Sequence, residues 1–160
     1  MESKPQKQHK WLDKLIGEWT YEADCSMGPD QPTAKFSGKE SVRSIGGLWV
    51  VAEGRGKMPG GGRATWIMSL GFDSQKKRFV GTWIGSMMSN LWIYDGVLNR
   101  SGRVLTLNTL GPNFAVKGKQ AKYKDVIEFK TKDYRTMTSS IQGKNGKWTK
   151  IMTAHYRRKK

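Results

Sequence analysis

Ten segments of this chain alternate apolar and polar residues with a period of two, and turn-forming sequences separate them. In the first segment, GEWTYEA (17–23), the polar residues stand at every second position. The other nine lie at residues 36–45, 48–57, 64–72, 78–87, 90–98, 103–109, 122–131, 134–142 and 148–157. Because successive side chains of a strand point to opposite faces, this period predicts half-buried strands. Their unbroken succession predicts an all-β fold, a meandering antiparallel sheet that loses its exposed edges by closing into a barrel.

Short sequences rich in Gly, Asn and Asp mark the turns. They lie at residues 46–47, 59–62, 73–76, 99–102 and 144–147. Asn145-Gly146, between two strand patterns, is the strongest hairpin signal in the chain, because both residue types adopt the positive φ of a tight hairpin turn.

The alternation also predicts which side chains face water. Between residues 122 and 132 the lysines fall on one face, whereas Tyr123 and Ile127 fall on the other. A slip of one residue would bury the lysines, so their face is predicted to be the outer one. The same counting in residues 148–157 places His155 inside the barrel.

One helix is predicted before the first strand, over residues 5–16. Pro5 suits its first turn, Trp11, Leu12 and Leu15 recur at helical spacing, and Gly17 ends it. Such a helix would cover an end of the barrel or lie across its first strand. A chain of 160 residues suits one domain. The expected division is a helix at 5–16, a barrel at 17–157 and a basic tail at 158–160.

The tripeptide Gly17-Glu18-Trp19 resembles the Gly-x-Trp that opens the first strand of lipocalin-like barrels. The resemblance implies a lipocalin-like antiparallel β-barrel of about ten strands with one N-terminal helix. It also implies that Trp19 packs at the closed end, under an arginine of the last strand. The alternation makes that arginine Arg157, or Arg158 if the register differs by one, and either would form a cation–π pair with the indole.

Four longer stretches are similar to the small bacterial proteins grouped as domain-of-unknown-function family 1579. They are HKWLDKLIGEWTYEA (9–23), ESVRSIGGLWVVAEGRGKMPGGG (40–62), LGFDSQKKRFVGTWIGSMMSNLWIYDGVL (70–98) and IMTAHYRRK (151–159). This resemblance implies a lipocalin- or calycin-like barrel and carries no catalytic residues. The chain departs from the family's usual balance by placing Lys or Arg at many positions, as a positively supercharged variant would.

The barrel interior is the predicted functional site. Trp and Met side chains form adaptable apolar pockets, so we expect non-catalytic binding of a small hydrophobic or aromatic ligand. The alternative is an interior filled by its own side chains. The candidate ligand-binding residues are Trp49, Glu53, Met68, Trp83, Met87, Trp92, Tyr94 and His155.

Glu53 and His155 are the polar candidates on otherwise apolar faces. A buried Glu or His must be hydrogen-bonded or shift its pKa. They could satisfy each other, or pair with Arg43 or Arg55. Alternatively, either could serve an enzyme as the general base acting on a bound ligand.

No cofactor is expected apart from one alternative. A lone His155 among Met and aromatic residues resembles the arrangement in haem-binding barrels of the nitrobindin type. Two histidines and one cysteine are too few for a zinc site, so no metal site is predicted.

The surface is strongly basic. There are 29 Lys and Arg residues against 13 Asp and Glu, a net charge of +16. Such a field attracts polyanions at low salt without a specific site. Because the bases are spread along the chain, a solvated surface is the simpler interpretation. A basic scaffold for electrostatic assembly with anionic partners is the alternative. A homo-oligomer is compatible with the sequence, although the net charge opposes it at low salt.

The sequence predicts a cytoplasmic protein. The N-terminal segment lacks the apolar region of a secretory signal, and no run of 18 apolar residues predicts a membrane span. Cys25, the one cysteine, excludes an internal disulfide and suits a reducing compartment.

Overall fold

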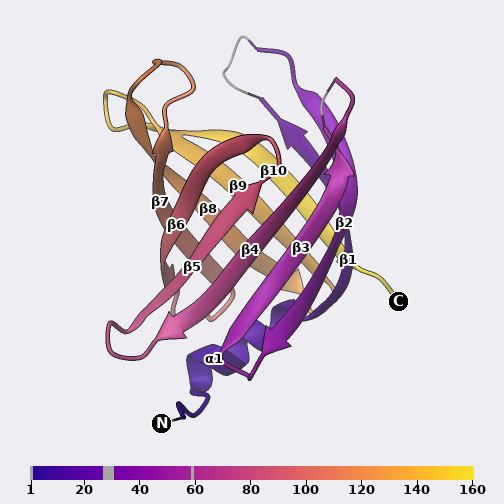
Figure 1. The fold of residues 1–160 in the computed structure, drawn as a ribbon, viewed down its shortest axis with the longest axis vertical. Helices are drawn as coiled ribbons and strands as arrows, with labels where there is room; N and C mark the ends of the chain where they lie inside the picture. The colour runs from indigo at the N-terminus through magenta and orange to yellow at the C-terminus, as the bar shows by residue number, and fades with distance from the viewer. Residues whose placement is uncertain (1, 27–30, 59) are drawn as a thin grey trace.

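The computed structural model describes residues 2–26, 31–58 and 60–160. Within this part of the chain, helix α1 (Lys7–Leu12) and the 3-10 helix η1 (Asp13–Leu15) precede ten strands (Figure 1). The strands are β1 (Gly17–Cys25), β2 (Ala34–Ile45), β3 (Trp49–Lys57), β4 (Arg63–Asp73), β5 (Arg78–Gly85), β6 (Met88–Leu98), β7 (Val104–Pro112), β8 (Gln120–Thr131), β9 (Tyr134–Gln142) and β10 (Trp148–Arg158).

The strands form one closed barrel. Each strand pairs antiparallel with its neighbours in the chain, and β10 closes the sheet by pairing with β1, with Tyr21 opposite Tyr156. The predicted all-β barrel with one N-terminal helix is therefore confirmed. β9 and β10 form the hairpin that Asn145-Gly146 predicts, with Gly146 at φ 77°, whereas Asn145 does not adopt a positive φ. Of the predicted turn at 59–62, Pro59 lies outside the described residues.

The N-terminal helical segment covers one end of the barrel (Figure 1). The Trp11 indole N–H donates to the Gly102 carbonyl at 2.6 Å, and His9 Nε2 lies 3.0 Å from the Phe72 carbonyl oxygen. The Trp11 ring also meets Phe79 and Phe129 edge to face. The regular helix is shorter than the predicted 5–16, because the chain tightens into a 3-10 turn at Asp13 and is extended again at Ile16.

Trp19 is buried beneath this helical segment, with 1% of its surface exposed. Its indole N–H donates to the Leu15 carbonyl at 2.9 Å. The guanidinium carbon of Arg158 lies 4.3 Å from the ring centroid, so the alternative register is the observed one. The expectation for Arg157 is wrong, because this exposed side chain lies over Tyr134 on the outer face, 4.3 Å from that ring.

A β-bulge explains the error at the end of the chain. The register of β10 against β9 shifts between Lys150 and Met152. Ile151 is the extra residue, so the alternation counted from residue 148 reverses beyond it. Tyr156 consequently points into the barrel, whereas His155 points outward and lies 2.7 Å from the Tyr134 hydroxyl.

The prediction for β3 is wrong in a different way. Val50, Ala52 and Gly54 face the interior, so Trp49 and Glu53 face outward. Gly54 is inward because the Trp66 ring occupies the space that a side chain there would need. Trp49 is apolar yet 42% exposed, and its ring covers Gly71 on the neighbouring strand β4.

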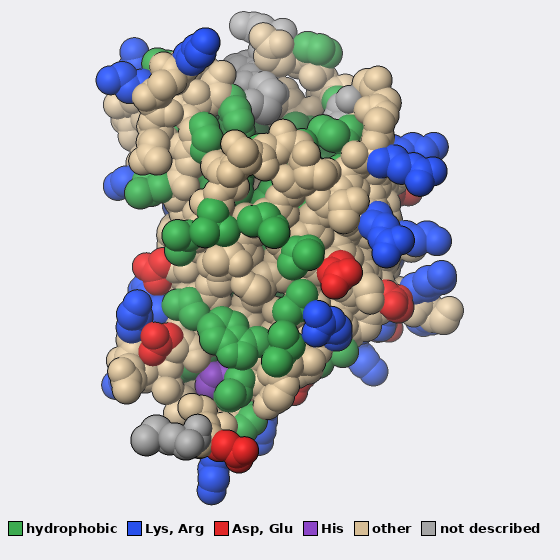
Figure 2. Space-filling view, viewed as in Figure 1, with side chains coloured by type: hydrophobic (Ala, Val, Ile, Leu, Met, Phe, Trp, Pro, Cys, Tyr) green, Lys and Arg blue, Asp and Glu red, His purple; other side chains and the backbone are tan. Residues whose placement is uncertain are grey.

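Apolar side chains also stand on the outer face of the barrel. Ile67, Ile84 and Ile93, on β4, β5 and β6, are 39%, 48% and 64% exposed. Figure 2 shows hydrophobic side chains across this face, with most charged ones toward its margins. On β8, in contrast, Tyr123 and Ile127 are buried and Lys122 is exposed, as predicted. No helix in the described residues is long and apolar enough to cross a membrane.

We predict that Trp19→Ala lowers the free energy of unfolding by about 3–5 kcal/mol, because it removes a fully buried indole. Urea denaturation monitored by circular dichroism measures the change. Trp49→Ala, which truncates an exposed Trp of the same barrel, is the control and should cost clearly less. Equal losses in the two variants would contradict the central role of Trp19.

Candidate functional site

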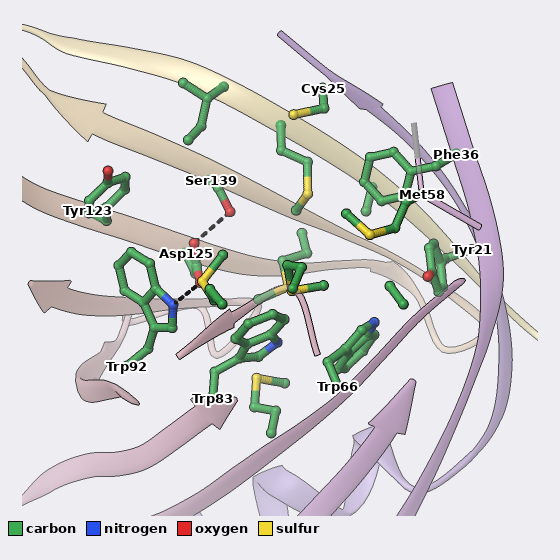
Figure 3. A pocket seen from close by; sticks show the side chains of 18 of the residues that line it. Tyr21, Cys25, Phe36, Met58, Trp66, Trp83, Trp92, Tyr123, Asp125 and Ser139 are labelled. Atoms are coloured by element: carbon green, nitrogen blue, oxygen red, sulfur yellow. Dashed lines mark hydrogen bonds between the residues drawn. The ribbon is translucent and has the colours of Figure 1, made fainter. Parts of the chain in front are cut away.

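The barrel interior contains a cavity of about 460 Å³. It extends toward the end opposite α1, where Lys57, Met58 and Phe114 belong to its lining. Its aromatic wall consists of Tyr21, Phe36, Trp66, Trp83, Trp92, Tyr94, Phe114, Tyr123 and Tyr156. Figure 3 labels six of them, Tyr21, Phe36, Trp66, Trp83, Trp92 and Tyr123. The methionines that line it are Met58, Met68, Met87, Met88, Met137 and Met152. The interior is therefore not filled by its own side chains.

The structure places five of the eight predicted ligand-binding residues at this cavity. They are Met68, Trp83, Met87, Trp92 and Tyr94. Trp49, Glu53 and His155 do not line it, because they point away from the interior. Neither proposed general base can therefore reach a ligand inside the barrel, and His155 cannot offer its ring to a haem there.

Flat aromatic surfaces dominate the cavity wall. The Trp66 and Trp83 rings are stacked at 23° with centroids 6.1 Å apart. Trp92 meets Tyr123 edge to face at 5.0 Å, and its indole N–H points to the Met88 sulfur at 3.0 Å. Because thioethers and indole faces adapt to irregular or flat apolar groups, this wall can hold such a molecule without directional bonds.

Asp125 provides a carboxyl group in this apolar wall. The Tyr94 hydroxyl donates to its Oδ2 at 2.5 Å. The Ser139 hydroxyl donates to Oδ1 of Asp125 at 2.6 Å, as Figure 3 shows. Burial raises the pKa of Asp125 above its ordinary value of 3.8, while these two hydrogen bonds oppose the rise. Burial likewise raises the pKa of Tyr94, and the negative charge of Asp125 adds to that rise.

Asp125 was missed in the sequence, although its position carried a signal. It stands between Tyr123 and Ile127 in the alternation, on the face predicted to be inside. A charged residue in the inward set of a strand is a candidate site residue, because burying it requires partners.

A second buried polar group lies at the closed end of the barrel. Glu40 on β2 and Arg135 on β9 form an ion pair in which each side chain is 1% exposed. The Arg135 guanidinium carbon also lies 4.5 Å from the Trp19 ring centroid and 4.0 Å from that of Tyr156. Burial raises the pKa of Glu40, and the nearby charge of Arg135 opposes this. This ion pair belongs to the packing of the closed end around Trp19, because neither residue lines the cavity.

We predict that Asp125→Asn changes the pH dependence of stability. Unfolded Asp125 releases its proton near pH 3.8, whereas the native state holds it to higher pH. Between the pKa of unfolded Asp125 and its higher native pKa, the native state therefore binds more protons than the unfolded state. The contribution of Asp125 to the free energy of unfolding consequently falls as pH rises through this range. The free energy of unfolding of the Asn variant, relative to that of the parent protein, should accordingly increase as pH rises from 3.8.

Urea denaturation of both proteins at stepped pH measures this difference. Asp24→Asn, on the exposed face of β1, controls for the loss of one negative charge. A difference that stays constant or shrinks with rising pH would contradict the prediction for Asp125.

Solved structures similar to this one show the fold. The S-type phycobiliprotein lyase CPES from Guillardia theta is 13% identical, with a TM-score of 0.65, and the match covers 97% of this chain and 94% of that chain. Rv2717c from M. tuberculosis is 11% identical, with a TM-score of 0.69, over 98% and 100%. EF1p2_mFAP2b bound to DFHBI is 10% identical, with a TM-score of 0.51, over 94% and 98%.

Comparison of the amino-acid sequence with known proteins identifies a family. No curated protein matches the chain. The model of the family described as "Protein of unknown function (DUF1579)" matches residues 4–158, which is nearly the whole chain. The long motifs and the barrel with its Gly-x-Trp plug agree with this match, and the protein belongs to the DUF1579 family.

Proposed function

We propose that the protein binds a small apolar or aromatic molecule inside the barrel, without chemistry. The observation that carries this proposal is the cavity of about 460 Å³, lined by Trp, Tyr and Met side chains and extending to one end of the barrel. Ligand cavities in proteins are typically about 300–1,000 Å³ and mostly apolar, with a few placed polar groups.

The wall composition favours a flat or irregular apolar body. A ligand among Trp66, Trp83 and Trp92 would remove both its own surface and these indole faces from water, at roughly 25 cal/mol per Å² of apolar area. The Asp125 carboxyl, fixed by Tyr94 and Ser139, is the polar group that would orient it. EF1p2_mFAP2b, a barrel of similar fold bound to DFHBI, is consistent with this use of the fold.

The first experiment measures binding of Nile red, an uncharged dye whose emission shifts to the blue in apolar surroundings. We expect saturable binding of one dye per chain. Ala64→Phe should weaken it by roughly tenfold or more, about 1.4 kcal/mol, because Ala64 lines the cavity and the larger ring would occupy it.

Thr65→Phe is the matched control, since Thr65 is the next residue of β4 and is exposed on the outer face. It should bind the dye like the parent protein. Circular dichroism and urea denaturation establish that both variants fold. Folded variants with equal affinity, or a parent protein that leaves the emission unshifted, would overturn the proposed function.

A further inference from the structure

Basic residues crowd the end of the barrel at which the cavity opens. We call this end the mouth; it comprises the described residues of the loops opposite α1 together with the three strand residues next to each loop (Figure 1). Its strand residues include Lys35, Arg55, Lys57, Arg63, Lys122 and Lys150. Its loops include Lys117, Lys119, Lys144 and Lys147. Among the described residues of the mouth, Asp24 is the one carboxylate that stands against these ten bases.

Ion pairing distinguishes the two ends of the barrel. Besides the buried Glu40–Arg135 pair, the ion pairs of the described residues are Arg78–Asp95, Lys130–Glu128 and Arg158–Asp133, and all three lie toward the closed end. None of the ten mouth bases forms an ion pair with a described carboxylate. Among the described residues, ion pairs thus compensate part of the positive charge at the closed end, whereas the ten mouth bases stand against Asp24 without an ion pair.

The basic mouth and the apolar cavity are in direct contact. Lys57, the last residue of β3, is exposed and also belongs to the cavity lining, next to Met58. Phe114, in the loop that carries Lys117 and Lys119, lines the cavity and is 52% exposed. A molecule in the cavity would therefore leave the apolar wall beside the ammonium group of Lys57, at the end of the barrel that carries the other mouth bases.

We propose that the ligand is an anionic amphiphile, with its apolar or aromatic body in the cavity and its carboxylate, sulfonate or phosphate group at the mouth beside Lys57. This inference rests on the proposed function and names the class of ligand. An anionic group at the mouth gains charge-assisted contacts while it stays hydrated, whereas burying it would cost its solvation. The reverse orientation is disfavoured, because it would remove the anionic group from water deep in an apolar wall and place it beside a second acidic group, Asp125.

The test compares dodecanoate with 1-dodecanol, two ligands with the same apolar chain, in displacing Nile red from the cavity. At low salt dodecanoate should bind at least about fivefold more tightly, and the advantage should shrink as salt screens the exposed charges. Lys57→Gln combined with Lys119→Gln should weaken dodecanoate by about fivefold and leave dodecanol within about twofold, because only the acid uses these charges.

Lys7→Gln combined with Lys76→Gln is the matched control. It removes the same number of positive charges at exposed positions of the closed end. It should leave both ligands within about twofold of the parent protein, because those charges lie far from the mouth.

The outcomes separate the two proposals. Equal affinity for dodecanoate and dodecanol overturns the anionic class and leaves the apolar cavity function standing. A loss of dodecanoate affinity that is the same in the mouth and closed-end variants also overturns it, because the net charge alone would then explain the preference. Failure of both ligands and of Nile red to bind overturns the proposed function itself.

Discussion

The Trp19 indole and the guanidinium groups around it hold the seam of the barrel together. The first and last strands meet at this seam. Trp19 comes from β1, and Arg158, from β10 beside it, also bonds to the carbonyl groups of Ile16 and Lys14. Arg135 from β9 contacts the same indole and reaches across to Glu40 on β2. Four strands and the helical segment are thus linked at one point. Removing one partner of such a buried ion pair would leave the other charge uncompensated.

The position of the cavity follows from this closed end. An eight-stranded barrel is just wide enough for its side chains to fill or to hold one small ligand, and the diameter grows with strand number. In this ten-stranded barrel, Trp19, the Glu40–Arg135 pair and the α1 segment occupy one end. The remaining interior is lined by Trp, Tyr and Met and extends to the other end. Closed-end packing, an apolar interior and a basic mouth therefore succeed one another along the barrel axis.

The sequence predicts the strands, their order and the Trp19 plug, because a period of two and turn residues are local signals. Prediction from the sequence fails where an extra residue reverses which side chains of a strand face the interior. The bulge at Ile151 turns His155 and Arg157 from the inner to the outer face. No residue type around Ile151 predicts a bulge. On β3 the small Gly54 is inward because Trp66, distant in sequence, needs its space. Trp49 is outward because it covers Gly71. The orientation of these residues depends on contacts with neighbouring strands, and the alternation of residues within one strand does not predict such contacts.

The interior between the Trp19 plug and the mouth is the proposed cavity for an apolar molecule. A crystal structure of the protein soaked with a brominated naphthalene tests it most directly, because the anomalous signal of bromine locates the molecule without prior assumptions. We expect the bromine inside the barrel, among Trp66, Trp83 and Trp92. An interior closed by collapsed Trp and Met side chains, with bromine found only on the outer apolar face, would show that the barrel does not bind an apolar molecule inside.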